Sequence, residues 1–76
     1  MTSRKVSIVE FYGVHHSVEE RKASVAARKA RKVLEKVRGN MPEMHVIAYE
    51  IEIEEFEKAG LASWIKSLIS EMEEYL

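Results

Sequence analysis

The chain has 76 residues, which is enough for one small domain (1–76) with a single hydrophobic core. It contains no cysteine, which excludes disulfides, thiolate metal sites and thiol redox chemistry. The net charge of −1 hides two opposite halves, since residues 1–40 carry 10 bases and 4 acids and residues 41–76 carry 2 bases and 9 acids. Such a polarised surface biases what the molecule attracts.

The composition also indicates an origin and a compartment. All 13 acids are Glu, with no Asp, no Gln and a single Asn. Enrichment in Glu, Lys and Arg with depletion of thermolabile amides is typical of thermophiles, so we expect a thermophilic source. Apolar runs are only a few residues long, so we expect no membrane contact and a soluble, cytoplasmic protein.

The first half of the chain predicts a strand and then a helix. Residues 4–12 (RKVSIVEFY) place apolar side chains on both faces, which favours a covered strand. Ser17 and Glu20 match a helix capping box, and Gly39-Asn40 supplies a stop, so we expect a helix over 18–38. Its expected inward stripe is Val18, Val25, Ala26, Ala30, Val33, Leu34 and Val37.

The second half predicts another strand and another helix. Residues 44–53 alternate apolar side chains with glutamates, as in a strand with one face in solvent. Residues 54–60 stay open between strand, loop and helix. The last helix is predicted from an amphipathic period of apolar residues: Leu61, Trp64, Ile65, Leu68, Ile69 and Met72.

The expected order is therefore βαβα, an α/β fold. A right-handed crossover through the long helix would make the two strands parallel neighbours, packed by two helices. Two strands and two helices form a thin core at this length. An extra strand or dimerisation would complete it.

Short motifs in these elements resemble the thioredoxin/glutaredoxin superfamily. Residues 9–13 (VEFYG) look like the first active-site strand of small archaeal glutaredoxin-like proteins, and residues 51–54 look like the acidic strand end of thioredoxins. The resemblance spans residues 4–69 and implies an archaeal source and a thioredoxin-like crossover. The family's Cys-x-x-Cys pair and cis-proline are absent, so it implies a fold without thiol–disulfide exchange.

Histidines are the weak candidates for metal or anion binding. His15 and His16 lie in the loop that enters the first helix, whereas His45 begins the second expected strand at the opposite sheet edge. A three-histidine cluster within one chain is therefore not expected, and ordinary loop histidines are the favoured interpretation. No cofactor is expected.

The segment 21–38 holds eight of the chain's 12 bases and predicts a basic helix surface. Phosphate contact with nucleic acid is one interpretation. The segment has no interleaved aromatic residue and the sequence pI is about 6.3, so a solvated helix with ion pairs is favoured. The candidate partner-binding or nucleic-acid-binding residues are Arg21, Arg28, Arg31, Lys32, Lys36 and Arg38.

The acidic half predicts a second charged surface. Its candidate partner-binding residues are Glu50, Glu52, Glu54, Glu71 and Glu74. A calcium site is not favoured, because there is no calcium-loop spacing and no Asp. Acids at the end of the last helix oppose the helix dipole, so either that end frays or cations come from elsewhere, and the basic helix of a neighbouring protomer could supply them.

No glycine-flanked serine elbow or phosphate-binding loop is present, so we expect no enzyme. The expected function is a small interaction module, as a homodimer or as a subunit of a larger assembly, that uses the basic helix and the acidic surface. The alternatives are nucleic-acid binding through 21–38 and metal or anion binding near His15 and His16.

Overall fold

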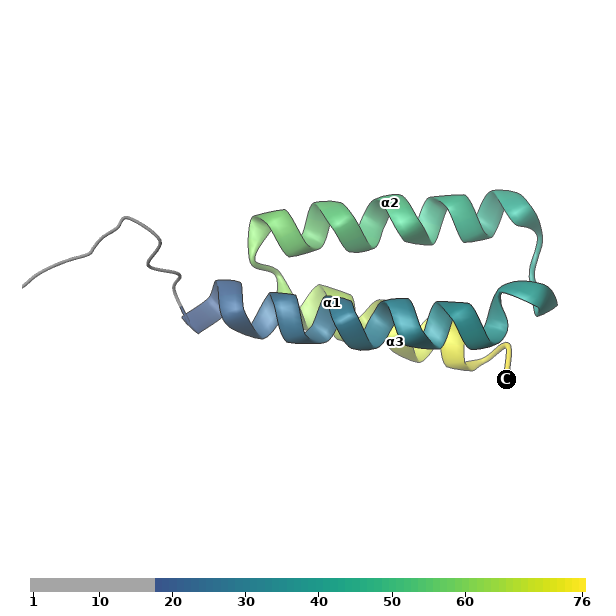
Figure 1. Cartoon of the computed structure of the whole chain (residues 1–76), viewed down its shortest axis with the longest axis horizontal. Helices are drawn as coiled ribbons and strands as arrows, with labels where there is room; N and C mark the ends of the chain where they lie inside the picture. The colour runs from purple at the N-terminus through teal and green to yellow at the C-terminus, as the bar shows by residue number, and fades with distance from the viewer. Residues whose placement is uncertain (1–17) are drawn as a thin grey trace, which may run out of the picture.

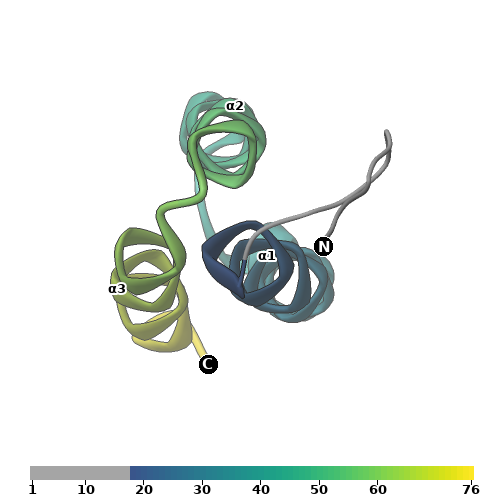
Figure 2. The ribbon, with the colours of Figure 1, turned by 90° about the vertical axis from the view of Figure 1, so that its left-hand side faces the viewer.

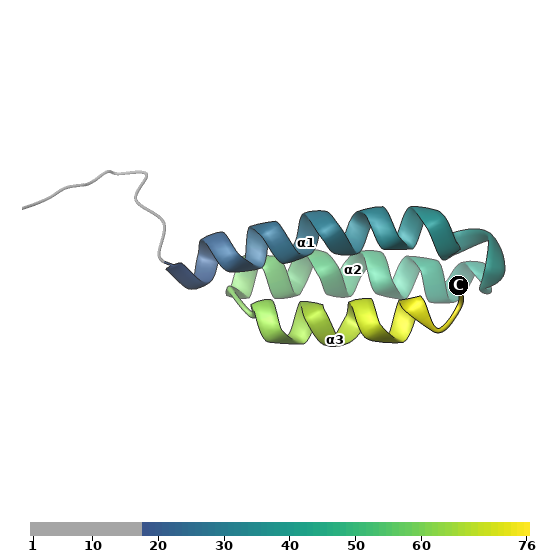
Figure 3. The same ribbon diagram turned by 90° about the horizontal axis from the view of Figure 1, so that it is seen from below.

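The computed structural model describes residues 18–76, and over that range it contains three α-helices and no β-strand. They are α1 (Val18–Val37), α2 (Glu43–Ala59) and α3 (Ala62–Glu73), with a short 3-10 helix, η1 (Arg38–Asn40), after α1. α1 and α3 run in the same direction and α2 runs in the opposite direction, so α2 is antiparallel to both of its neighbours (Figures 1 and 3). Seen from one end, they occupy the corners of a triangle (Figure 2).

The predicted α/β class, the βαβα order and the thioredoxin-like likeness are wrong. Residues 44–53, expected as the second strand, form most of α2, and the described part of the chain has no strand to pair. The first expected strand, 4–12, and the capping residue Ser17 lie outside the described residues. The helix expected over 18–38 and the amphipathic helix after Gly60 are confirmed.

α2 is helical because its ends and its composition agree on a helix. Pro42 precedes it with a φ of −59°, and its carbonyl accepts hydrogen bonds from the N–H groups of His45 and Val46 at 3.0 and 3.2 Å. Six of its 17 residues are glutamates, which are good helix formers. Apolar residues on two faces of this helix produced the alternation that resembled a strand.

Gly60 ends α2 and answers the question left open for residues 54–60. Its φ of 73° is left-handed, a conformation that glycine adopts without the cost of a Cβ. The N–H of Leu61 then donates to the carbonyl of Phe56 at 2.9 Å, as in a Schellman motif. Residues up to Ala59 are therefore helical, and the chain reverses sharply into α3.

α1 packs against the other two helices through a face of small residues. Ala23, Ala27 and Ala30 are completely buried, so the helix backbone can approach α2 and α3 closely. Two residues of the predicted stripe, Val18 and Val25, are exposed instead. The valines lie off the alanine face, and the packing of α3 against that face leaves them in solvent.

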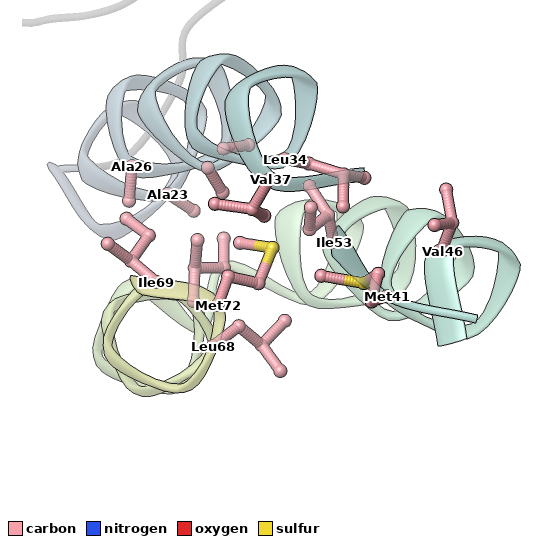
Figure 4. Close-up of a cluster of buried hydrophobic side chains, with 13 residues drawn as sticks. Ala23, Ala26, Leu34, Val37, Met41, Val46, Ile53, Leu68, Ile69 and Met72 are labelled. Carbon is pink, nitrogen blue, oxygen red and sulfur yellow. The ribbon is translucent and has the colours of Figure 1, made fainter. Parts of the chain in front are cut away.

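Aliphatic side chains from all three helices fill the core (Figure 4). The largest fully buried ones are Ile53, Ile65, Met72, Val37 and Val46. Trp64, predicted to pack inward, is 58 % exposed and meets Phe56 edge to face, with ring centroids 5.4 Å apart. None of the helices described is both long and apolar enough to cross a membrane.

Candidate protein-binding groove

Some of the basic side chains of α1 and η1 form ion pairs within the molecule. Arg31 Nη2 lies 2.8 Å from Glu57 Oε1 of α2, in an ion pair that is also a hydrogen bond. Arg38 Nη1 donates to Glu35 at 3.0 Å and lies 4.0 Å from a carboxylate oxygen of Glu50. These pairs are solvent-exposed, so each contributes roughly 0.2–1 kcal/mol. They link the basic and acidic halves within one molecule.

The other candidate bases of α1 lie on its exposed side. Arg28 and Lys32, with Arg31, line a shallow hollow of about 460 Å³ that also includes Glu35 and Glu57. Arg21 belongs to a different surface, described next, and Lys36 is exposed outside both hollows. The six bases predicted as one surface are therefore divided among several.

A larger groove, of about 640 Å³, runs between α1 and α3. Its apolar lining includes Val25 and Ala26 from α1 and Ile69 from α3, and no residue of α2 contributes. Ala26 is small, so the two helices leave a depression above it, and Val25, which is 62 % exposed, stands at its edge. We call this surface the α1/α3 groove.

Basic side chains border the α1/α3 groove. Lys22 and Lys29 come from α1 and Lys66 from α3, and within residues 18–76 none of the three has an ion-pair partner. Arg21 also lines the groove, and Glu73 is its one acid. An apolar surface bordered by unpaired lysines favours an occupant that is both apolar and acidic.

Sequence reasoning missed most of this groove. It assigned Val25 to the core and Lys66 to an otherwise acidic half, so nothing joined them. One signal was available: Val18 and Val25 are seven residues apart and off the face of Ala23, Ala27 and Ala30, which indicates a second apolar stripe on α1.

α2 carries a second exposed apolar surface. Met44, Ile47 and Ile51 are 72, 47 and 51 % exposed, and we call them the α2 stripe. They lie about 100–160° around the helix axis from the buried Val46, so they point away from α1 and α3. Isolated exposed apolar residues are common, but these three are at helical spacing and form a continuous apolar strip along one side of α2.

The predicted acidic surface is also divided. On a helix, Glu50 and Glu54 share one face and Glu52 lies on the opposite side, and Glu54 pairs with Lys58 at 3.4 Å. Glu71 accepts a hydrogen bond of 3.1 Å from the Tyr49 hydroxyl, which ties α3 to α2. Burial first, and that hydrogen bond second, raise the pKa of Tyr49 to about 12. Glu74 is exposed after the end of α3.

No metal site is evident in residues 18–76, where no group of three potential ligands converges. His45 is exposed near the start of α2. His15 and His16 lie outside the described residues. The weak metal or anion hypothesis for this pair therefore stays a prediction.

Comparisons with protein-family models, curated proteins and solved structures find no match to this chain. The α1/α3 groove combines apolar area with basic side chains, and the α2 stripe is a second exposed apolar surface.

Proposed function

We propose that this chain is a non-enzymatic interaction module that binds an acidic amphipathic helix of a protein partner in the α1/α3 groove. The observation that supports the proposal is the apolar lining beside Lys22, Lys29 and Lys66, three lysines without ion-pair partners in the described region. Helix-in-groove recognition uses this combination, since apolar anchors enter the groove and charges at its border select the partner.

A synthetic peptide tests this proposal. The probe is a helical peptide with leucines at positions i, i+3, i+4 and i+7 and glutamates beside them, and the matched control peptide carries lysines in place of the glutamates. Titration followed by NMR should shift the amides of α1 and α3 that line the groove. The acidic peptide should bind about tenfold or more tightly than the basic one, because charge reversal turns attraction into repulsion.

Two variants locate the binding. Lys22→Glu/Lys29→Glu should weaken binding of the acidic peptide about tenfold or more, since each reversed exposed charge changes the free energy by about 1 kcal/mol. Lys32→Glu/Lys36→Glu makes the same charge change outside the groove and should retain binding. Equal binding of both peptides, or equal loss in both variants, would refute the proposal.

Nucleic-acid binding remains the second candidate. Arg28 and Lys32, neighbours at i and i+4 on α1, have no ion-pair partner within residues 18–76 and line one hollow. Arg31 and Arg38, by contrast, are already engaged with acids of α2. The test is a mobility shift with duplex DNA and RNA at several salt concentrations, in which Arg28→Glu/Lys32→Glu should abolish any salt-sensitive complex.

A further inference from the structure

We infer that the occupant of the α1/α3 groove is the α2 stripe of a second copy of this chain. This inference rests on the proposed function and names its partner. It predicts that the molecule carries both halves of one helix-in-groove contact.

The two surfaces match in chemistry. The α2 stripe is followed, one turn after Ile51, by Glu55, and is preceded, one turn before Ile47, by Glu43. Both glutamates are exposed and neither has an ion-pair partner in the described part of the chain. The stripe is therefore apolar with acids at both ends, which complements an apolar groove with lysines at its border.

The two surfaces also match in length. Met44 and Ile51, the ends of the α2 stripe, are seven residues apart, or about 10 Å along a helix. Lys22 and Lys29, on the α1 side of the groove, have the same separation. The apolar part of one surface can therefore lie along the apolar part of the other.

The position of the two surfaces determines the type of assembly. α2 occupies one corner of the triangle in Figure 2. The side chains of its stripe are exposed, whereas α1 and α3 form the groove without α2. A stripe that binds the next copy's groove leaves a free groove and a free stripe at the two ends. Such heterologous contacts add copies head to tail, so species beyond the dimer should form.

Two half-blocked variants provide the test. Lys22→Glu/Lys29→Glu blocks the groove and keeps the stripe, and Ile47→Ser/Ile51→Ser blocks the stripe and keeps the groove. The changed side chains are exposed, so the fold should persist, and far-UV circular dichroism checks it. Sedimentation velocity from about 10 μM to about 1 mM covers the affinities of contacts smaller than a standard interface.

The wild type should form species that grow with concentration, and each variant alone should remain monomeric. An equimolar mixture of the two variants should give a 1:1 complex that does not grow further, because it contains one intact groove and one intact stripe. Lys32→Glu/Lys36→Glu, the matched control, should assemble like the wild type. Higher salt should weaken the assembly, since opposite charges contribute to it.

Three results would overturn the inference. The first is a wild type that is monomeric throughout, with no complex in the mixture, and the second is self-association that both variants retain. The third is a set of nuclear Overhauser contacts between residues 1–17 and the groove in a dilute sample, which would assign the groove to the chain's own N-terminal segment. If the acidic peptide still binds the groove in the first two cases, the proposed function survives; if it does not, both proposals fail.

Discussion

α1 and α2 are neighbouring helices of similar length that bury different kinds of side chain in the core. α1 buries small residues, with Ala23, Ala27 and Ala30 at zero exposure, and keeps most of its charge outside. α2 buries Val46 and Ile53 and leaves three further large apolar side chains in solvent. The number of apolar residues in a helix therefore does not predict how much of it is buried, because small residues permit close contact and large ones can remain for a partner.

The largest expected effect tests the few core contacts of α2. Ile53→Ala should lower the free energy of unfolding by about 2–5 kcal/mol, because it removes a fully buried side chain and leaves a cavity. Ile51→Ala, the matched change two residues earlier, removes a half-exposed side chain and should cost well under half as much. Urea denaturation followed by circular dichroism measures both. Equal losses would mean that α2 presents a different face to the core.

The second prediction tests the close approach of α1. Ala27→Leu should destabilise the bundle by about 1–3 kcal/mol, because the added atoms have no space at a position with zero exposure. Ala48→Leu, on the exposed side of α2, should change stability by less than about 0.5 kcal/mol. A neutral Ala27→Leu variant would show that α1 packs more loosely than its alanines indicate.

The third prediction tests the left-handed glycine, Gly60, in the turn between α2 and α3. Gly60→Ala should cost about 1 kcal/mol, because Gly60 has a φ of 73° and an added Cβ is strained there. Gly39→Ala is the control, since no atom lies within 4 Å of its added Cβ and its φ is not positive. Thermal unfolding of the two variants makes the comparison. A Gly39 variant that is the less stable of the two would contradict it.

The smallest effect is a dependence on pH at the contact between α2 and α3. The pKa of Tyr49 is raised from 10.0 to about 12, so between these values the unfolded chain loses the proton first. The contribution of Tyr49 to stability is therefore present below pH 10 and is lost as the pH rises towards 12. The urea midpoint should fall less over this range in Tyr49→Phe than in the wild type, and Tyr75→Phe should retain the wild-type fall.

Local sequence signals predicted the first and last helices, α1 and α3, well. Acids at the start of α1, Lys36 near its end and the regular apolar spacing of α3 each indicate a helix without reference to other elements. α1 spans Val18–Val37 where 18–38 was predicted, and α3, whose start was left open, spans Ala62–Glu73. Their buried faces were predicted less well, because Val18, Val25 and Trp64 satisfy the helical period and yet are exposed.

The strand predicted at 44–53 failed for a physical reason. Isoleucine and valine favour strands, and a helix with apolar residues on two faces can show an alternation like that of a strand. Pro42 and Gly60, at the two ends of a segment longer than an ordinary strand, were the signals for a helix. The resemblance to thioredoxin-like proteins required a strand end at residues 51–54, which lie within α2.

The candidate surfaces depended on the fold even more. The basic residues of 21–38 were identified from sequence, but which of them pair with Glu50 and Glu57 follows from α2 lying beside α1. Lys66 and Lys29 meet at one groove because α1 and α3 pack together, although they are far apart in the chain.

By itself the sequence determined the charge division, the absence of thiol chemistry and the helices whose end signals and apolar period agree. These properties depend on residue identity and short-range spacing. The tertiary structure alone decided which apolar face of α2 is buried and which is exposed, that some opposite charges pair within the molecule, and that an apolar groove lies between α1 and α3. Each of these depends on which helix faces which, and short-range spacing does not encode that choice.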